Sequence, residues 1–131
     1  MAVQHSVAVR NARLDAIEST IGVSPTLELR TGVPPASCAT ADSGVVLATM
    51  VLPADWMAAA AAGVKAFSGT WSDAAADSSG TFGHFRIKQG ATCHYQGTAG
   101  LAGNDIVMDS ATCTAGQAVS INSFTITEGN A

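Results

Sequence analysis

The chain has 131 residues, the size of one ordinary domain, and 47% of them are hydrophobic, which excludes an intrinsically disordered protein. Only 12% are charged, about half the usual proportion, so we expect a surface of small polar residues that neighbouring subunits partly cover. The net charge of −4 argues against a nucleic-acid partner. We expect no secretion signal, and no apolar run approaches the roughly 20 residues that span a membrane.

The first 22 residues differ in pattern from the rest of the chain. Apolar residues recur there at helical spacing, which predicts an α-helix over 12–21 with Asn11 as N-cap and Gly22 as the stop. This helix could pack on its own domain or act as an arm on another subunit. We divide the chain into an arm (1–22) and a β-domain (23–131). The candidate assembly interface on the arm consists of Val7, Leu14, Ile17 and Ile21.

Short strands and turns follow the helix. Polar and apolar residues alternate around Leu27 and Leu29, which is typical of a half-buried strand. Trp56 and the alanines at 58–62 predict one short Ala-rich helix that Gly63 ends, because alanine has the highest helix propensity. The strands expected in this part of the chain cover 26–30, 44–52 and 65–71.

The clearest hairpin has its turn near Gly90. A three-residue loop would pair Ile87 with Cys93 and Phe85 with Tyr95, and so separate an apolar face from a polar one. We therefore expect these four side chains to face the core. The polar face would meet water or a neighbouring subunit, and two of its residues join the candidate assembly interface: Arg86 and His94.

The C-terminal part adds a short strand over 106–108 and a last strand over 118–127. Val119 and Ile121 share one face of that last strand, whereas Phe124 and Ile126 share the other, which predicts a β-bulge near 122–123. Together the elements predict a mainly β fold: an antiparallel sandwich or barrel of about seven short strands, with the N-terminal helix and the Ala-rich helix.

Residues that could carry chemistry are sparse, so we expect neither enzyme activity nor a cofactor. No serine lies in a nucleophile motif, and the glycine spacing matches neither a dinucleotide fingerprint nor a phosphate-binding loop. Neighbouring Cys93 and His94 would point to opposite faces of a strand, so we expect no metal site. Three scattered aromatic residues could instead form a sugar-stacking platform or belong to the core: Trp56, Trp71 and Tyr95.

The cysteine count is three, without close spacing: Cys38, Cys93 and Cys113. An odd number without a regular pattern favours reduced, partly buried thiols over a disulfide framework. One disulfide formed after cell lysis, or metal ligation, are the alternatives.

Six runs spread over nearly the whole chain carry a resemblance: 14–18 (LDAIE), 29–32 (LRTG, followed by Pro34-Pro35), 52–57 (LPADWM), 68–71 (SGTW), 83–87 (GHFRI) and 116–127 (GQAVSINSFTIT). In these runs the chain resembles a family of small phage and prophage virion structural proteins. None of the runs is catalytic, so the resemblance implies an assembly role and no reaction.

The resemblance implies a non-enzymatic minor capsid subunit, a decoration or cement protein that stabilises the head shell. Its partners would be the major capsid protein or other virion proteins and, by analogy with such subunits, further copies of itself in a homotrimer. It would reside in the virion, which assembles in the bacterial cytoplasm. The alternatives are a tail or baseplate component and a carbohydrate-binding module on the particle surface.

Overall fold

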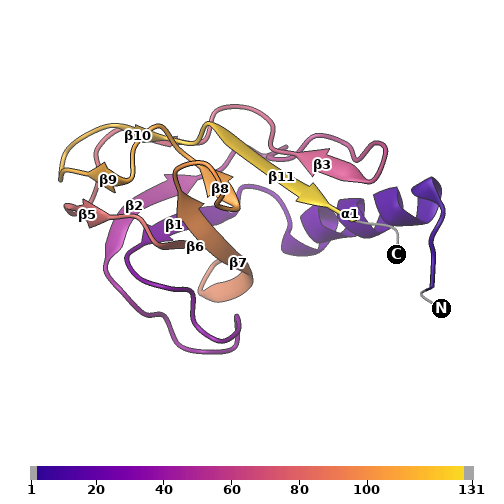
Figure 1. The fold of residues 1–131 in the computed structure, drawn as a ribbon, viewed down its shortest axis with the longest axis horizontal. Helices are drawn as coiled ribbons and strands as arrows, with labels where there is room; N and C mark the ends of the chain where they lie inside the picture. The colour runs from indigo at the N-terminus through magenta and orange to yellow at the C-terminus, as the bar shows by residue number, and fades with distance from the viewer. Residues whose placement is uncertain (1–2, 129–131) are drawn as a thin grey trace.

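The computed structural model describes residues 3–128, which form a mainly β, sandwich-like fold with one α-helix (Figure 1). The predicted fold class is thereby confirmed. The elements are α1 (Val7–Ile21), β1 (Thr26–Arg30), β2 (Val46–Val51), β3 (Val64–Ala66), β4 (Ser72–Asp73), β5 (Gly80–Thr81), β6 (His84–Gln89), β7 (Thr92–Gly100), β8 (Ile106–Val107), β9 (Thr112–Cys113), β10 (Val119–Ser120) and β11 (Ser123–Thr127).

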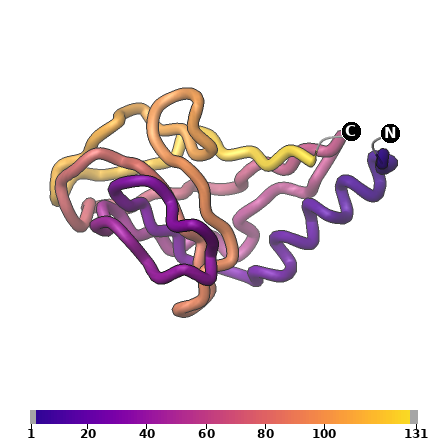
Figure 2. The backbone as a smooth tube through the Cα atoms, turned by 60° about the horizontal axis from the view of Figure 1, so that its bottom comes forward, coloured from indigo at the N-terminus to yellow at the C-terminus, as the bar shows by residue number. Residues whose placement is uncertain are grey.

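The main sheet has seven strands in the order β2-β1-β6-β7-β8-β11-β3. All neighbouring strands are antiparallel except β7 and β8, which run parallel over two residue pairs. The sheet is therefore mixed, whereas the sequence predicted a wholly antiparallel one. Two further ladders, β10 with β4 and β5 with β9, have two strands each. The tube in Figure 2 shows the segment between β1 and β2 as a long loop that projects from the rest of the chain.

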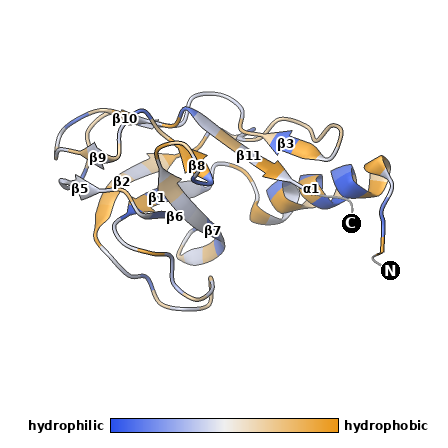
Figure 3. Cartoon of the chain, viewed as in Figure 1, coloured by the Kyte–Doolittle hydropathy of each residue, from blue (hydrophilic) through white to orange (hydrophobic). Residues whose placement is uncertain are grey.

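Aromatic side chains form the centre of the core. The ring of Phe124 lies 5.6 Å from both the Trp71 and the Phe85 rings, centroid to centroid, and Trp56 lies 6.0 Å from Trp71. All four residues are at most 1% exposed. Such tilted and edge-on pairs stabilise a core beyond the area they bury. Coloured by hydropathy, both the strands around this centre and α1 mix apolar and polar residues (Figure 3).

Helix α1 begins earlier than predicted, at Val7, and its N-cap is Ser6 in place of Asn11. The Ser6 hydroxyl accepts a hydrogen bond from the Val9 amide, which satisfies one of the free amides at a helix start. The predicted end is confirmed, because Gly22 has a φ of 93° and its amide donates to the Glu18 carbonyl. Among the described residues, no helix is long and apolar enough to cross a membrane.

The predicted Ala-rich helix at 58–62 is wrong. The segment is extended and pairs with β3 as a hairpin, with a tight turn at Ala62 and Gly63, whose φ angles are 52° and 74°. The Ala58 amide donates to Ala66, and Ala61 and Val64 exchange two backbone hydrogen bonds. The hydrogen bonds of this hairpin replace those of a helix, and the helix propensity of alanine is only a weak preference.

The predicted register of the β6–β7 hairpin is also wrong. Ile87 lies opposite Tyr95, and Phe85 opposite Gly97, because the loop has two residues and β7 carries a bulge at His94. Phe85 and Ile87 face the core as predicted. The alternate residues of β6 are buried as well, because the segment between β1 and β2 covers the other face of the strand.

The predicted last strand is divided into β10 and β11. Val119, Ile121 and Phe124 are all buried in the same core although Ile121 and Phe124 differ in parity, so the change of face occurs where the sequence placed it. The chain leaves the ladder at residues 121–122, where the Ile121 amide donates to Trp71 and the Asn122 amide to Val107. A break between two ladders therefore takes the place of the expected bulge.

Candidate functional site

A groove runs between α1 and β7 and brings together three of the six residues predicted for the assembly interface: Ile17, Ile21 and His94. It has a volume of about 300 Å³. Its full lining is Arg13, Ala16, Ile17, Thr20, Ile21, His94 and Tyr95. The helix contributes apolar side chains together with Arg13 and Thr20, and the strand contributes a histidine and a tyrosine, so the lining is part apolar and part polar.

Tyr95 connects this groove to the aromatic core. Its ring stacks on Phe85 with centroids 6.1 Å apart and lies edge-on to Phe124 at the same distance. Burial, with a smaller contribution from the Asp105 carboxylate, raises the pKa of Tyr95 above its ordinary value of 10.0, so the phenol is neutral at physiological pH. The strand side of the groove is therefore uncharged at this residue and packed against the core.

Three polar side chains on one face of α1 hold the helix against the Ala-rich hairpin. Asn11, Asp15 and Glu18, spaced four and three residues apart, accept hydrogen bonds from the backbone amides of Gly63, Ala60 and Met57, at 2.9, 3.0 and 3.0 Å. These amides lie on the outer edge of the hairpin, which would otherwise be open to pairing with another chain. The helix thus covers a strand edge, a role for which its sequence gave no signal.

Lys65 is the buried centre of this contact. Its side chain is 1% exposed, and its ammonium group lies 2.7 Å from Asp15, 3.1 Å from Glu18 and 2.8 Å from the Ala58 carbonyl. Burial alone would lower the pKa of Lys65, but hydrogen bonds to the two carboxylates outweigh it and raise the pKa. The hydrogen bond from Lys65 in turn lowers the pKa of Asp15. Ion pairs between a buried lysine of β3 and two carboxylates of α1 thus join the helix to the sheet.

The other predicted interface residues lie outside the groove. Leu14 is 0% exposed and packs inside the chain's own fold, and Arg86 is 2% exposed on β6, so neither is presented to another subunit as expected. Ile21, although it lines the groove, is only 4% exposed. Val7 is 47% exposed on the first turn of α1. The apolar stripe of the helix therefore serves mainly its own domain.

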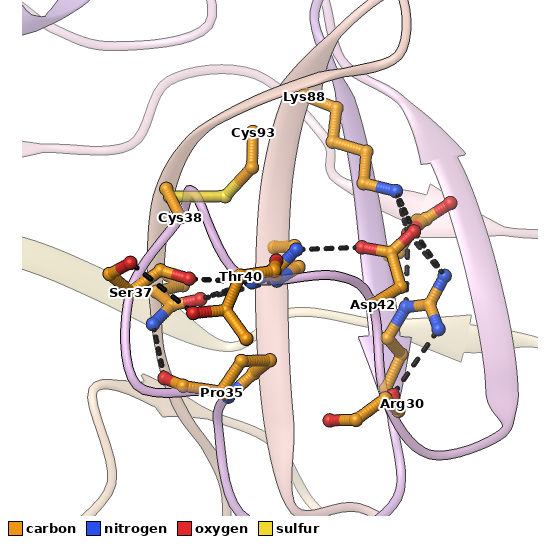
Figure 4. Close-up of polar contacts among 12 residues, drawn as sticks. Arg30, Pro35, Ser37, Cys38, Thr40, Asp42, Lys88 and Cys93 are labelled. Carbon is orange, nitrogen blue, oxygen red and sulfur yellow. Dashed lines mark hydrogen bonds and ion pairs between the residues drawn. A yellow bond between two sulfur atoms is a disulfide. The ribbon is translucent and has the colours of Figure 1, made fainter.

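Arg86 belongs to a polar cluster beneath the cover loop, which is the segment 31–45 between β1 and β2. We call Arg30, Arg86 and Lys88 the basic cluster. All three contact one carboxylate of the loop, that of Asp42, at 3.3, 2.7 and 2.5 Å (Figure 4). The hydrogen bond from Lys88 is the main cause that lowers the pKa of Asp42. Glu28 supplies a second carboxylate to Arg30 and Lys88.

The expectation of three reduced cysteines is wrong for two of them. A disulfide joins Cys38 in the cover loop to Cys93 in β7. Cys113 is free and buried, and burial raises its pKa, which disfavours the reactive thiolate. The pairing was hidden in the sequence because Cys38 and Cys93 are 55 residues apart.

The aromatic residues do not form a sugar-stacking platform. Trp56 and Trp71 are each 1% exposed, and their indole groups donate to the carbonyls of Gly22 and Ser68 inside the protein. His84 is 0% exposed, and its Nδ1 donates to the Gly32 carbonyl at 2.9 Å. Within residues 3–128, no three His, Cys, Asp or Glu side chains form a group that could hold a metal ion.

Comparisons of the chain with protein-family models, with curated proteins and with solved structures gave no match.

Proposed function

We propose that the protein is a non-enzymatic structural subunit of a phage particle, a minor capsid or decoration protein that attaches through the groove between α1 and β7. The observation that carries the proposal is the convergence in this groove of Ile17 and His94, which come from segments more than 70 residues apart, above the buried Ile21. A cleft that combines apolar and polar side chains in this way has the composition of a protein–protein contact.

Two further features support a place in a virion. The surface has few charges, as expected where neighbouring subunits cover much of it. The Cys38–Cys93 disulfide suits a protein that functions in oxidising surroundings, as a particle does once it has left the host cytoplasm. The partners we propose are the major capsid protein and two further copies of this chain, in a trimer assembled in the bacterial cytoplasm.

The test uses a matched pair of charge insertions on α1. Ala16→Glu places a carboxylate in the groove, whereas Ala8→Glu places one at an exposed position about 12 Å away along the same helix. Both residues are exposed on the helix, so both variants should fold with unchanged circular dichroism and melting temperature. Each purified variant is then mixed with particles that lack the native subunit, and bound copies are counted after sedimentation.

We expect Ala16→Glu to reduce the bound copies at least tenfold and Ala8→Glu to bind like the wild type. Equal binding by all three proteins would show that the groove is not the attachment site. Failure of the wild type to bind particles would refute the virion role itself. Analytical ultracentrifugation of the free protein tests the proposed trimer separately.

A further inference from the structure

The cover loop is attached to the rest of the protein without contributing to its core. No core residue lies between Leu29 and Leu47. Within residues 33–44, the one backbone–backbone hydrogen bond outside helices and strands joins Thr40 to Ser37, inside the loop itself. A segment with so few buried apolar contacts can open without unfolding the domain beneath it.

What holds the loop in place is polar, apart from the disulfide. Arg86 donates to the carbonyls of Ser37 and Thr40 at 2.9 and 3.0 Å, and Gln96 donates to the Pro35 carbonyl at 2.7 Å. Arg30 reaches the Ser43 carbonyl at 3.3 Å. Together with the ion pairs of Asp42, these contacts come from the sheet side, chiefly from the basic cluster (Figure 4).

The basic cluster is an unusual concentration of charge for this chain. The sequence has six lysines and arginines in total, and half of them lie under this one loop, each at most 8% exposed. With the loop in place, the two carboxylates of Asp42 and Glu28 offset most of the charge of the three cations Arg30, Arg86 and Lys88. With the loop removed, Glu28 alone would remain, and three cations would face one carboxylate.

We propose that the cover loop is a disulfide-locked lid over a carboxylate-binding surface, and that Asp42 occupies this surface in place of an acidic segment of a protein partner. While the Cys38–Cys93 bond is intact, Asp42 is held at a high effective concentration, so an external carboxylate cannot displace it. Once the bond is reduced, the loop opens and the basic cluster binds the partner. This inference does not depend on the proposed virion role.

The opening step is an ordinary thiol–disulfide exchange. A dithiol reductant transfers two electrons and two protons, the bond between the two sulfur atoms breaks, and Cys38 and Cys93 become thiols while the reductant forms its own disulfide. The bacterial cytoplasm keeps thiols reduced, whereas the extracellular medium does not. The surface would therefore be open in a reducing compartment and closed in an oxidising one.

A carboxylate-bearing protein segment fits this surface better than a nucleic acid. The present occupant is a carboxylate that spans all three cations. Glu28 lies within the cluster and offsets part of its positive charge, which suits one or two carboxylates better than the continuous backbone charge of a nucleic acid.

The test measures binding of a labelled octaglutamate peptide at low salt by fluorescence anisotropy, with hydrogen exchange of residues 33–44 followed in parallel. The proteins are the oxidised wild type, the dithiothreitol-reduced wild type and Cys38→Ser/Cys93→Ser, with oxidised Cys113→Ser as the control that keeps the bridge. We expect at least tenfold tighter binding and faster exchange in the two unbridged proteins alone. Lys88→Gln in the unbridged background should abolish the gain, whereas Arg13→Gln, which also removes one cation, should leave it.

Unchanged affinity or unchanged exchange after reduction would overturn the lid. Global unfolding on reduction, seen as loss of the cooperative melt in both unbridged proteins, would overturn it too, because the loop would then not be separable from the core. Tighter binding of an eight-nucleotide oligothymidylate than of the peptide would overturn the proposal that the surface binds carboxylates.

Discussion

The charge balance at Lys65 predicts that the carboxylates around it matter more for stability than the lysine itself. Lys65 is 1% exposed, whereas the side chains of Asp15 and Glu18 are 49% and 22% exposed. Asp15→Asn with Glu18→Gln keeps oxygen acceptors for the backbone amides of Ala60 and Met57. The change isolates the charge, because the ammonium group stays buried while both of its counterions disappear.

The expected loss of unfolding free energy in this double variant follows from the cost of an uncompensated buried charge, which is about 3–5 kcal/mol. Solvent already screens the half-exposed Asp15, so we expect a value near the lower end, about 3 kcal/mol. That is a large part of the 5–15 kcal/mol that typically stabilises a domain. Adding Lys65→Met removes the buried charge and should restore about 2 kcal/mol, since a buried ion pair can usually be replaced by apolar groups at little cost.

The assay is urea unfolding at pH 7, followed by the fluorescence of the buried Trp56 and Trp71. Arg13→Gln is the control: it also removes a charge from α1, but Arg13 is 52% exposed, and we expect less than about 0.5 kcal/mol of change. The reasoning is refuted if the double amide variant is no less stable than Arg13→Gln. It is equally refuted if Lys65→Met destabilises the double variant further.

Two more predictions follow from the same contacts. A chain that begins at Val23 loses the buried Leu14 and Ile21 and leaves the buried Lys65 without its carboxylate partners, so we expect no cooperative thermal transition by circular dichroism. A sharp melt would show that the helix is a separable arm. The pKa of Asp42 lies below its ordinary value of 3.8 in the folded protein. The stability that its ion pairs contribute is therefore fully present above pH 3.8 and is lost as the pH falls through the lowered pKa. Asp42→Asn should therefore flatten the fall in stability between pH 4 and pH 2, measured by urea unfolding, and an unchanged slope would contradict the ion pairs of Asp42.

Local patterns in the sequence determined the fold class and much of the core. The alternation around Leu27 and Leu29, the change of face between Ile121 and Phe124 and the stop at Gly22 all reappear in the structure. These features depend on residues a few positions apart, because side chains alternate across a strand with a period of two and a helix ends where the backbone can turn. The groove was anticipated in part, since Ile17, Ile21 and His94 were expected at an interface.

Tertiary structure decided the features that join distant segments. The alanines at 58–62 form an extended hairpin because Asn11, Asp15 and Glu18 bind its edge amides, and Arg86 is buried because the cover loop crosses β6. The Cys38–Cys93 disulfide arises in the same way. Helix propensity differs by less than about 1 kcal/mol per residue among ordinary residues, so a few backbone hydrogen bonds to a distant partner outweigh it. Which partner reaches a given strand or loop depends on how the whole chain packs, and periodicity within one segment does not contain that information.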